Sequence, residues 1–320
     1  MGNTKGIKPL VIFHADCTDG FAAAFSCWLK LGDAAEYLPM QYNKDTSPDI
    51  MAEKCRNREV YILDFSFERK VMEHIFQAAK CVVWCDHHKT AFEMWCAEFP
   101  YHFEKNGPDD EKYIVLDNNK SGALLAWEYF HPNTEVPLLI RHIDDRDRWV
   151  FALPGSKELH AALWSYRPWN FEQWKELNRQ LQTWDDHGGD FPHFLFKEGT
   201  AILRAQEQNI AQMVKQARKC EIKYIQNEPF QLWPIKEELA LVGLALNAPI
   251  HQSEIGHELA NQSGTYGLVW YVGADSRVKC SLRSNGDYDV STIAKAFSGG
   301  GHRNASGMEV SVKELMSWLC

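Results

Sequence analysis

Residues 81–88 read CVVWCDHH, an apolar run that ends in three ionisable side chains. A short apolar run rich in β-branched and aromatic residues is typical of a strand that is buried on both faces of a sheet. Such a strand explains Val82–Trp84, but it does not explain Asp86, His87 and His88 at its end. The stretch therefore predicts a buried strand that ends in ionisable residues of a functional site.

The segments on either side alternate between strand and helix patterns. Strands are predicted at 9–16, 60–66, 81–86 and 112–117, and helices at 20–32, 67–80 and 121–130. Strands that alternate with helices predict a parallel sheet with helices on its faces. Ligands of such sheets bind at the carboxyl ends of the strands.

The pattern changes in the second half of the chain. Residues 171–218 are polar and helical, apart from a break with Gly and Pro at 185–194. Short strand patterns follow at 222–226, 240–246, 266–272 and 277–284. We therefore expect an α/β protein with a parallel-sheet domain (1–194), a linker helix (195–220) and a smaller mixed α/β domain (221–320).

Composition narrows the class of protein. The chain has 320 residues and a formal net charge of −9, which disfavours binding of long duplex DNA through a general positive field. It shows no apolar stretch long enough to span a membrane, and we do not expect a secretory signal, because no apolar segment precedes the first predicted strand. Its nine cysteines are scattered, odd in number and without a Cys-x-x-Cys pair. This usage is typical of a reducing compartment, so we expect a cytoplasmic protein.

Acids and imidazoles recur at four predicted strand ends. The four segments are HADCTDG (His14, Asp16, Asp19), ILDFS (Asp64), CDHH (Asp86, His87, His88) and RHIDDRDRW (Asp144, Asp145, Asp147). A single carboxylate at such a place is usually a helix cap or a turn residue. Four segments that converge on one edge of a sheet would crowd like charges, which divalent metal ions relieve. Asp and His with little thiolate favour Mn²⁺, or Mg²⁺, over a structural zinc, and a shared Asp can bridge two ions.

These motifs, in this order, resemble those of the DHH phosphoesterase family. HADCTDG, ILDFS, CDHH, IDDRD and GGGHRNASG extend from residue 14 to residue 307. The resemblance is closest to branches in which a DHH domain precedes a DHH-associated substrate-binding domain with a GGGH motif. Those branches include nano-RNases, single-strand exonucleases and cyclic-dinucleotide phosphodiesterases. The resemblance implies an enzyme with two Mn²⁺ ions that hydrolyses short oligonucleotides or dinucleotides by attack of a metal-activated water.

The resemblance also implies a role for each motif residue. His14 would bind the first metal, Asp64 would bridge both, and Asp19, His87 and Asp145 would bind the second. Asp86 would orient an imidazole, and His88 and His302 would act on the substrate phosphate. Asp145 is chosen over Asp144 and Asp147 by alignment on Ile143.

One position departs from the family pattern. The first motif usually has an Asp where this chain has Cys17. Cys17 could be a softer ligand, Asp16 or a water could replace the missing Asp, or the first metal could bind weakly. We favour Asp16 or a water in that place, and we count Asp16 among the expected metal ligands.

The glycine-rich segment 298–307 (SGGGHRNASG) is expected to contact the substrate. Glycines allow backbone amides to approach a phosphate closely, and His302 and Arg303 add donors beside them. A helix end followed by a hairpin turn is the alternative structural role. The expected substrate contacts are Arg283, Gly299, Gly300, Gly301, His302, Arg303 and Ser306, with Asn247 as a weaker candidate. Arg283 could equally be a solvated arginine at a strand end.

Two other functions remain open from the sequence. The same metals would serve a phosphatase of polyphosphate or small phosphate esters. Loss of the first metal through Cys17 would leave a non-catalytic nucleotide sensor. We expect no membrane partner, and an oligomer is compatible with the sequence.

Overall fold

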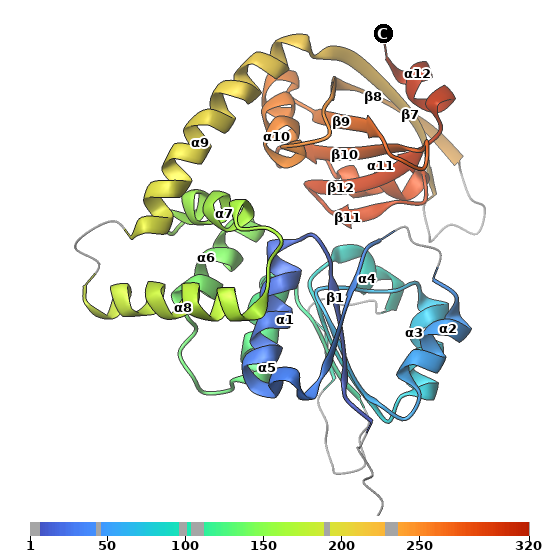
Figure 1. Cartoon of the computed structure of the whole chain (residues 1–320). Helices are drawn as coiled ribbons and strands as arrows, with labels where there is room; N and C mark the ends of the chain where they lie inside the picture. Colours follow the sequence, from blue (N-terminus) through green and yellow to red (C-terminus); the bar gives the residue numbers. More distant parts are fainter. Residues whose placement is uncertain are drawn as a thin grey trace, which may run out of the picture. The chain divides into compact units, whose positions relative to one another are not determined.

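The chain folds into two compact units, Met1–Leu203 and Arg204–Cys320 (Figure 1). The computed structural model describes residues 7–42, 46–95, 101–103, 112–188, 193–227 and 236–319. The boundary between the units falls inside helix α9 (Phe194–Met213). The break predicted at 185–194 lies partly outside the described residues.

The first unit is built on a six-stranded sheet with the order β2-β1-β3-β4-β6-β5. Its strands are β1 (Leu10–His14), β2 (Glu36–Met40), β3 (Glu59–Leu63), β4 (Cys81–Asp86), β5 (Tyr101–Phe103) and β6 (Lys112–Leu116). Neighbouring strands are parallel except for the edge strand β5, which is antiparallel to β6. The predicted α/β class with a parallel sheet is confirmed.

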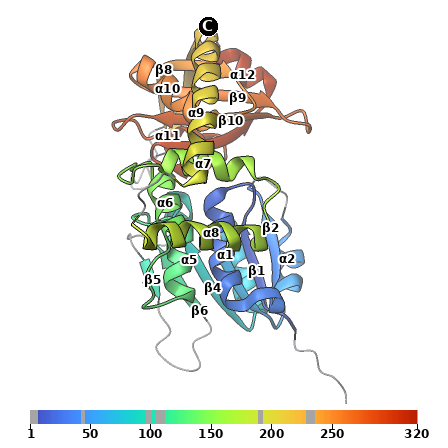
Figure 2. The same ribbon diagram turned by 60° about the vertical axis from the view of Figure 1, so that its left-hand side comes forward.

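Helices cover both faces of this sheet, as Figure 1 shows. They are α1 (Thr18–Leu31), η1 (Gly32–Ala34), α2 (Pro48–Cys55), α3 (Arg69–Ala78), α4 (Lys89–Trp95), α5 (Gly122–Phe130), α6 (Leu138–Asp147), α7 (Ser156–Ser165) and α8 (Phe171–Asp186). Helices α2, α3 and α4 pack on one face, and α1 and α5 pack on the other. Helices α6, α7 and α8 add a further layer outside α1 and α5, around the buried Trp174 (Figure 2).

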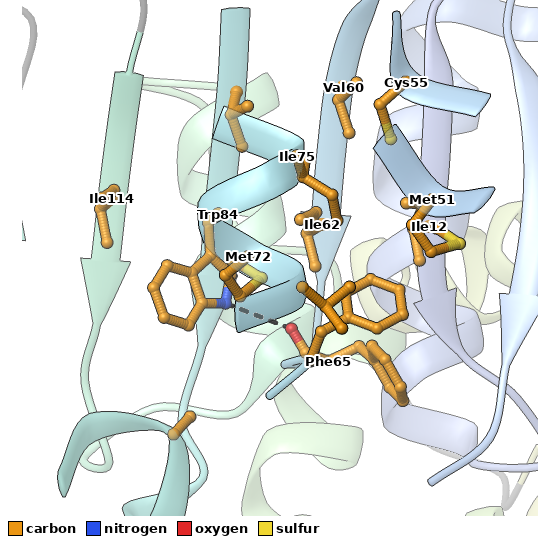
Figure 3. Close-up of a cluster of buried hydrophobic side chains, with 14 of the residues drawn as sticks. Ile12, Met51, Cys55, Val60, Ile62, Phe65, Met72, Ile75, Trp84 and Ile114 are labelled. Carbon is orange, nitrogen blue, oxygen red and sulfur yellow. Dashed lines mark hydrogen bonds between the residues drawn. The ribbon is translucent and has the colours of Figure 1, made fainter. Parts of the chain in front are cut away.

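One row of side chains crosses four strands and builds the core under α2 and α3. Ile12, Ile62, Trp84 and Ile114 are register partners on adjacent strands and share a face (Figure 3). The Trp84 indole donates to the carbonyl of Phe65 (3.2 Å). The strands end one or two residues beyond this row, so the core fixes where the acids of the strand ends lie.

The second unit contains another six-stranded sheet, with the order β11-β12-β10-β9-β8-β7. Its elements are η2 (Val214–Gln216), β7 (Arg218–Asn227), β8 (Lys236–Asn247), α10 (Gln252–Ser263), β9 (Tyr266–Val272), β10 (Val278–Ser284), α11 (Val290–Ala296), β11 (Gly300–His302), β12 (Ala305–Val310) and α12 (Val312–Trp318). Only the pair β8 and β9 is parallel within the described strands. This is the smaller mixed sheet that the sequence indicated.

Two further features bear on the predictions from composition. No described helix is long and apolar enough to cross a membrane. Seven cysteines in the described residues form no disulfide, while Cys96 and Cys320 lie outside the described residues.

Candidate metal centre

Asp64 lies at the centre of a buried group of acids and imidazoles. It follows β3, its amide donates to the carbonyl of Cys85 (2.9 Å), and its φ of 53° is in the left-handed region. That conformation is uncommon for a residue other than glycine and is often found at functional sites. The side chain is 1% exposed, yet neither oxygen has a donor in ordinary hydrogen-bond geometry among the described residues. A buried carboxylate in this state is costly, and a cation would satisfy it.

Two imidazoles flank Asp64. His87 Nε2 lies 3.1 Å from Oδ1, and His14 Nδ1 lies 3.5 Å from Oδ2. Burial alone would raise the pKa of Asp64, but the two imidazoles outweigh it and hold this pKa well below its usual range. Burial likewise opposes protonation of His87, yet Asp64, Asp147 and Asp19 raise the pKa of His87 well above its usual value. The carboxylates around His87 therefore favour positive charge at this place.

Asp19 and Asp147 complete this anionic group. Asp19 Oδ2 lies 3.5 Å and Asp147 Oδ2 lies 3.6 Å from His87 Nε2. Asp19 also accepts from the first amides of α5, those of Gly122 (2.7 Å) and Ala123 (2.9 Å). Burial and the like charges of Asp64 and Asp147 raise the pKa of Asp19 well above its usual value. Three carboxylates around one imidazole repel one another unless positive charge is shared among them.

The donor atoms fall into sets that suit metal binding. In each of three sets, one atom per residue lies within 4.8 Å of the others. The sets are His14, Cys17 and Asp64; Asp19, His87 and Asp147; and Asp64, Asp86, His87 and His88. Mixed carboxylate and imidazole donors with buried, unsatisfied oxygens fit divalent transition ions. These residues therefore fit the divalent metal ions that the sequence implied. Asp64 lies next to both flanking imidazoles, those of His14 and His87.

Asp86 orients His88. Its Oδ1 accepts from the backbone amide of His87 (2.8 Å) and from Nδ1 of His88 (2.7 Å). Its Oδ2 accepts from the hydroxyl of Ser66. Burial would raise the pKa of Asp86, but His88 outweighs this effect and lowers it. With Nδ1 bound to Asp86, the ring of His88 is fixed in orientation, as expected for a side chain that contacts substrate.

Asp16 lies away from the cluster. Its φ is 54°, its side chain is 54% exposed, and its carboxylate accepts from Arg167 and Gln41. The next residue, Cys17, has extended backbone angles (φ −125°, ψ 135°). The thiol therefore joins His14 and Asp64, while the carboxylate that the sequence favoured does not.

The fourth acid segment differs from its prediction. It forms the end of helix α6 rather than following a strand, so that part of the prediction is wrong. The carboxylate of Asp145 accepts from the amides of Ala152 (2.7 Å) and Leu153 (3.1 Å). Residues two apart on a helix point about 200° apart. Asp147, not Asp145, is therefore the acid that lies beside His87.

The neighbouring acid of α6, Asp144, also has structural partners. Its carboxylate accepts from the amide of Ser121 (2.8 Å) and from the guanidinium of Arg148 (2.8 Å).

Two residues beside the centre were not singled out from the sequence. Tyr42 stacks on Phe65 (4.5 Å between ring centroids) and meets the rings of His14 (5.1 Å) and His88 (5.7 Å) edge on. Ser66 links Asp86 to the indole of Trp84 (3.1 Å). Tyr42 follows β2, so the rule that sites gather at strand ends would have found it. Strand β2 contains Pro39, which is tolerated at a sheet edge but obscures the strand pattern.

The glycine-rich segment of the second unit is a β-hairpin rather than an open loop. Gly300, Gly301 and His302 form β11 and pair with Gly307, Ser306 and Ala305 of β12. A Cβ on Gly299 would lie 2.2 Å from the carbonyl of Gly307, and Gly301 has a φ of 136°. The glycines are thus required by close strand packing and by a left-handed backbone conformation.

The other expected substrate contacts have partners inside the second unit. Arg303 donates to the carbonyls of Gly286 (3.1 Å) and Asp287 (3.1 Å). The hydroxyl of Ser306 donates to the carbonyl of His302 (2.7 Å).

Arg283 and Asn247 are also held by neighbours. Arg283 donates to the hydroxyls of Ser281 (2.9 Å) and Ser253 (2.8 Å). The amide of Asn247 donates to the carbonyl of Trp270 (3.0 Å). The guanidinium of Arg283 is therefore fixed in place, whichever role it has.

Comparison with known proteins identifies the family. A DHHA1 domain profile matches residues 245–319, within the second unit. The uncharacterized protein R106 of Acanthamoeba polyphaga mimivirus is 31% identical over 317 residues, 94% of this chain and 67% of R106. The chain belongs to the DHH phosphoesterase family.

Two further proteins to which the chain is similar have named activities. Oligoribonuclease NrnB of Bacillus subtilis is 23% identical over 267 residues, 81% of this chain and 61% of NrnB. The chain thus spans about two thirds of the length of R106 and less of NrnB. Among solved structures, the pGpG-specific phosphodiesterase PggH of Vibrio cholerae is 14% identical, with 97% of this chain and 96% of that chain covered and a TM-score of 0.41.

Proposed function

We propose that this DHH phosphoesterase is a divalent-metal-dependent phosphodiesterase that hydrolyses short oligonucleotides or dinucleotides. The observation that carries the proposal is the buried carboxylate of Asp64 without a hydrogen-bond donor of ordinary geometry among the described residues. It lies between His14 and His87 at the carboxyl edge of the parallel sheet. The name of the relative NrnB supports oligoribonucleotides as the substrate class.

The chain's own residues would hold the ions in two positions. His14 and Asp64 belong to one position, Asp19, His87 and Asp147 belong to the other, and Asp64 lies adjacent to both. Bound there, Mn²⁺ or Mg²⁺ would lower the pKa of a water to generate the nucleophile and would offset the charge of the phosphate. Asp147 takes the role that the sequence had given to Asp145, because the carboxylate of Asp145 is held by amides of the following loop.

His88 would act on the substrate phosphate. Asp86 accepts from its Nδ1 at 2.7 Å, which fixes the orientation of the ring. An imidazole donor held beside the scissile phosphate would stabilise the negative charge that develops on the phosphate in the transition state. We also propose that His302 and the guanidinium of Arg283 contact the phosphates of the substrate.

The test is a screen of substrates in which each product is resolved by mass. The substrates are 5′-phosphorylated diribonucleotides, oligoribonucleotides of increasing length, cyclic dinucleotides and polyphosphate, each with Mn²⁺ and with Mg²⁺. We expect mononucleotides from the shortest substrates, and we expect the Asp64→Asn variant to lose this activity. Cleavage of polyphosphate alone would favour the phosphatase alternative. Binding of dinucleotides without any product, in all metals, would favour the sensor and contradict the proposal.

A further inference from the structure

The loop between β1 and α1 brings a thiol, and not a carboxylate, to the first metal position. Donor atoms of Cys17, His14 and Asp64 all lie within 4.8 Å of one another. Cys17 is half-buried and immediately precedes α1. The backbone changes from left-handed at residue 16 to extended at residue 17, so the two side chains point in different directions.

The competing carboxylate is committed to other partners. Asp16 accepts from the guanidinium of Arg167 and from the side-chain amide of Gln41. Arg167 is itself fixed, because its guanidinium lies over the rings of Trp164 (4.5 Å) and Trp169 (5.3 Å). To reach His14, the carboxylate of Asp16 would have to leave this charged pair and change its backbone conformation.

Asp64 is the independent sign that a cation belongs beside Cys17. Its side chain is 99% buried, and both oxygens lack a donor of ordinary geometry in the part of the chain that the structure describes. Such oxygens cost free energy unless hydrogen bonds or a metal satisfy them. Oδ2 faces His14 at 3.5 Å, on the side where the thiol lies.

We propose that the thiolate of Cys17, together with His14 and Asp64, binds one of the metal ions of this centre and makes that position selective for thiophilic divalent ions. One sulfur, one nitrogen and one oxygen donor suit Zn²⁺, Co²⁺ or Cd²⁺ better than Mg²⁺, which prefers oxygen ligands in octahedral geometry. Binding releases the thiol proton to solvent. The inference rests on the proposed metal-dependent function and adds the chemical class of the ion.

The test is the absorption spectrum of the full chain loaded with Co²⁺. A thiolate bound to Co²⁺ gives a charge-transfer band in the near ultraviolet, which nitrogen and oxygen ligands do not give. We expect this band in the natural chain, and we expect it to be lost in Cys17→Ser and Cys17→Asp. Cys81→Ser is the matched control, because Cys81 is also a half-buried cysteine but is the first residue of β4, at the end of the strand opposite to Asp86. The control and Asp16→Asn should both keep the band.

A second measurement compares metal affinities by calorimetry. Replacing the thiolate by a carboxylate in Cys17→Asp should lower the affinity for Cd²⁺ relative to Mg²⁺ by at least about tenfold, since loss of even a supporting partner costs about 10- to 100-fold. Circular dichroism of each variant checks that it is folded.

The outcomes separate this inference from the proposed function. Co²⁺ that binds without the band, or does not bind, would overturn the role of Cys17 even in a chain that cleaves dinucleotides. A band that Cys17→Ser retains would overturn it as well. A band that depends on Cys17 in a chain that cleaves no phosphodiester would uphold the ligand and reject the proposed function.

Discussion

Gly122, the first residue of α5, lies directly against the side chain of Asp64. A Cβ built on Gly122 would lie 2.4 Å from the Cβ and 2.8 Å from Oδ1 of Asp64. Real Cβ atoms do not approach other atoms this closely, so only glycine leaves Asp64 in its place. The same residue uses its amide to bind Asp19 (2.7 Å). The start of α5 thus positions two acids of the centre at once.

Gly122→Ala should therefore impair metal binding more than it impairs folding. Alanine favours a helix over glycine by up to about 1 kcal/mol, which offsets part of the strain. The affinity for Mn²⁺, measured by calorimetry, should fall at least about tenfold because Asp64 must move. Ala126→Gly is the control: it weakens the same helix but lies one turn farther on. Equal Mn²⁺ affinity in the natural chain and Gly122→Ala would show that Asp64 is not a ligand.

Changing Asp145 to Asn should mainly lower stability, whereas changing Asp147 to Asn should mainly lower metal affinity. Asp145→Asn loses acceptors for the amides of Ala152 and Leu153, and we expect it to lower the free energy of unfolding by about 1–3 kcal/mol. Asp147→Asn should leave stability nearly unchanged, because it removes one of three like charges, but should lower Mn²⁺ affinity. Urea unfolding and calorimetry on both variants measure the two effects. Loss of metal affinity in Asp145→Asn alone would restore the assignment made from the sequence.

The strand ends were predictable from the sequence, and the residues off the strands were not. Apolar runs fix the register Phe13–Leu63–Cys85, and the next residues along the chain are His14, Asp64 and Asp86. The structure brings these together because parallel strands end at one edge of the sheet.

Asp147 and Cys17 required information that the apolar pattern does not contain. Asp147 is on a helix, where the side that an acid faces depends on how α6 packs. The choice between Asp16 and Cys17 depends on one left-handed residue, which spacing in the sequence does not reveal.

A buried histidine beside Asp145 should make the first unit sensitive to acid. His142 is 4% exposed, and its Nδ1 donates to the oxygen of Ser156 (2.9 Å), whose hydroxyl donates to Asp145 (2.5 Å). Burial lowers the pKa of His142 to about 4, with Arg141 adding to the effect and Asp145 opposing it. Between its ordinary value of 6.5 and about 4 the unfolded chain binds this proton more readily than the folded chain. The free energy of unfolding should therefore fall as the pH falls through this window, by up to roughly 3 kcal/mol.

His142→Asn tests this contribution, because the amide keeps a donor for Ser156 but does not titrate. The pKa values of His14 and His87 are raised, so these residues add stability at low pH that is lost as the pH rises. Both proteins contain these two histidines, so their contribution cancels when the free energies of unfolding of the natural chain and the variant are subtracted. Urea unfolding at several pH values between 4 and 7 gives the free energy of unfolding at each pH. This free energy should change less with pH in the variant than in the natural chain. An identical change with pH in both proteins would mean that His142 does not remain neutral in the folded state.

Two fully buried tryptophans should differ in what their indole nitrogen contributes. The nitrogen of Trp84 donates to Phe65 and Ser66, whereas that of Trp174 has no acceptor among the described residues. Trp84→Phe should cost about 1–3 kcal/mol more than Trp174→Phe, because it leaves a buried carbonyl unsatisfied. Denaturant unfolding of the two variants measures the difference. A larger loss of the free energy of unfolding in Trp174→Phe would show that the packing of the indole ring, and not the hydrogen bonds of Trp84, determines the cost of the substitution.

Added Mn²⁺ should raise the melting temperature of the first unit through Asp64. A ligand at about 100 times its dissociation constant stabilises the folded state by about 2.7 kcal/mol, which corresponds to roughly 5–10 °C for a domain of this size. Asp64→Asn should abolish this shift, because the group then loses the acid that lies next to both imidazoles. Asp117→Asn is the matched control: Asp117 is also buried after a strand of the same sheet, but its carboxylate accepts from Asn119 (2.9 Å). Differential scanning calorimetry with Mn²⁺ or a chelator should show the full shift in the control, and a shift that Asp64→Asn retains would place the metal elsewhere.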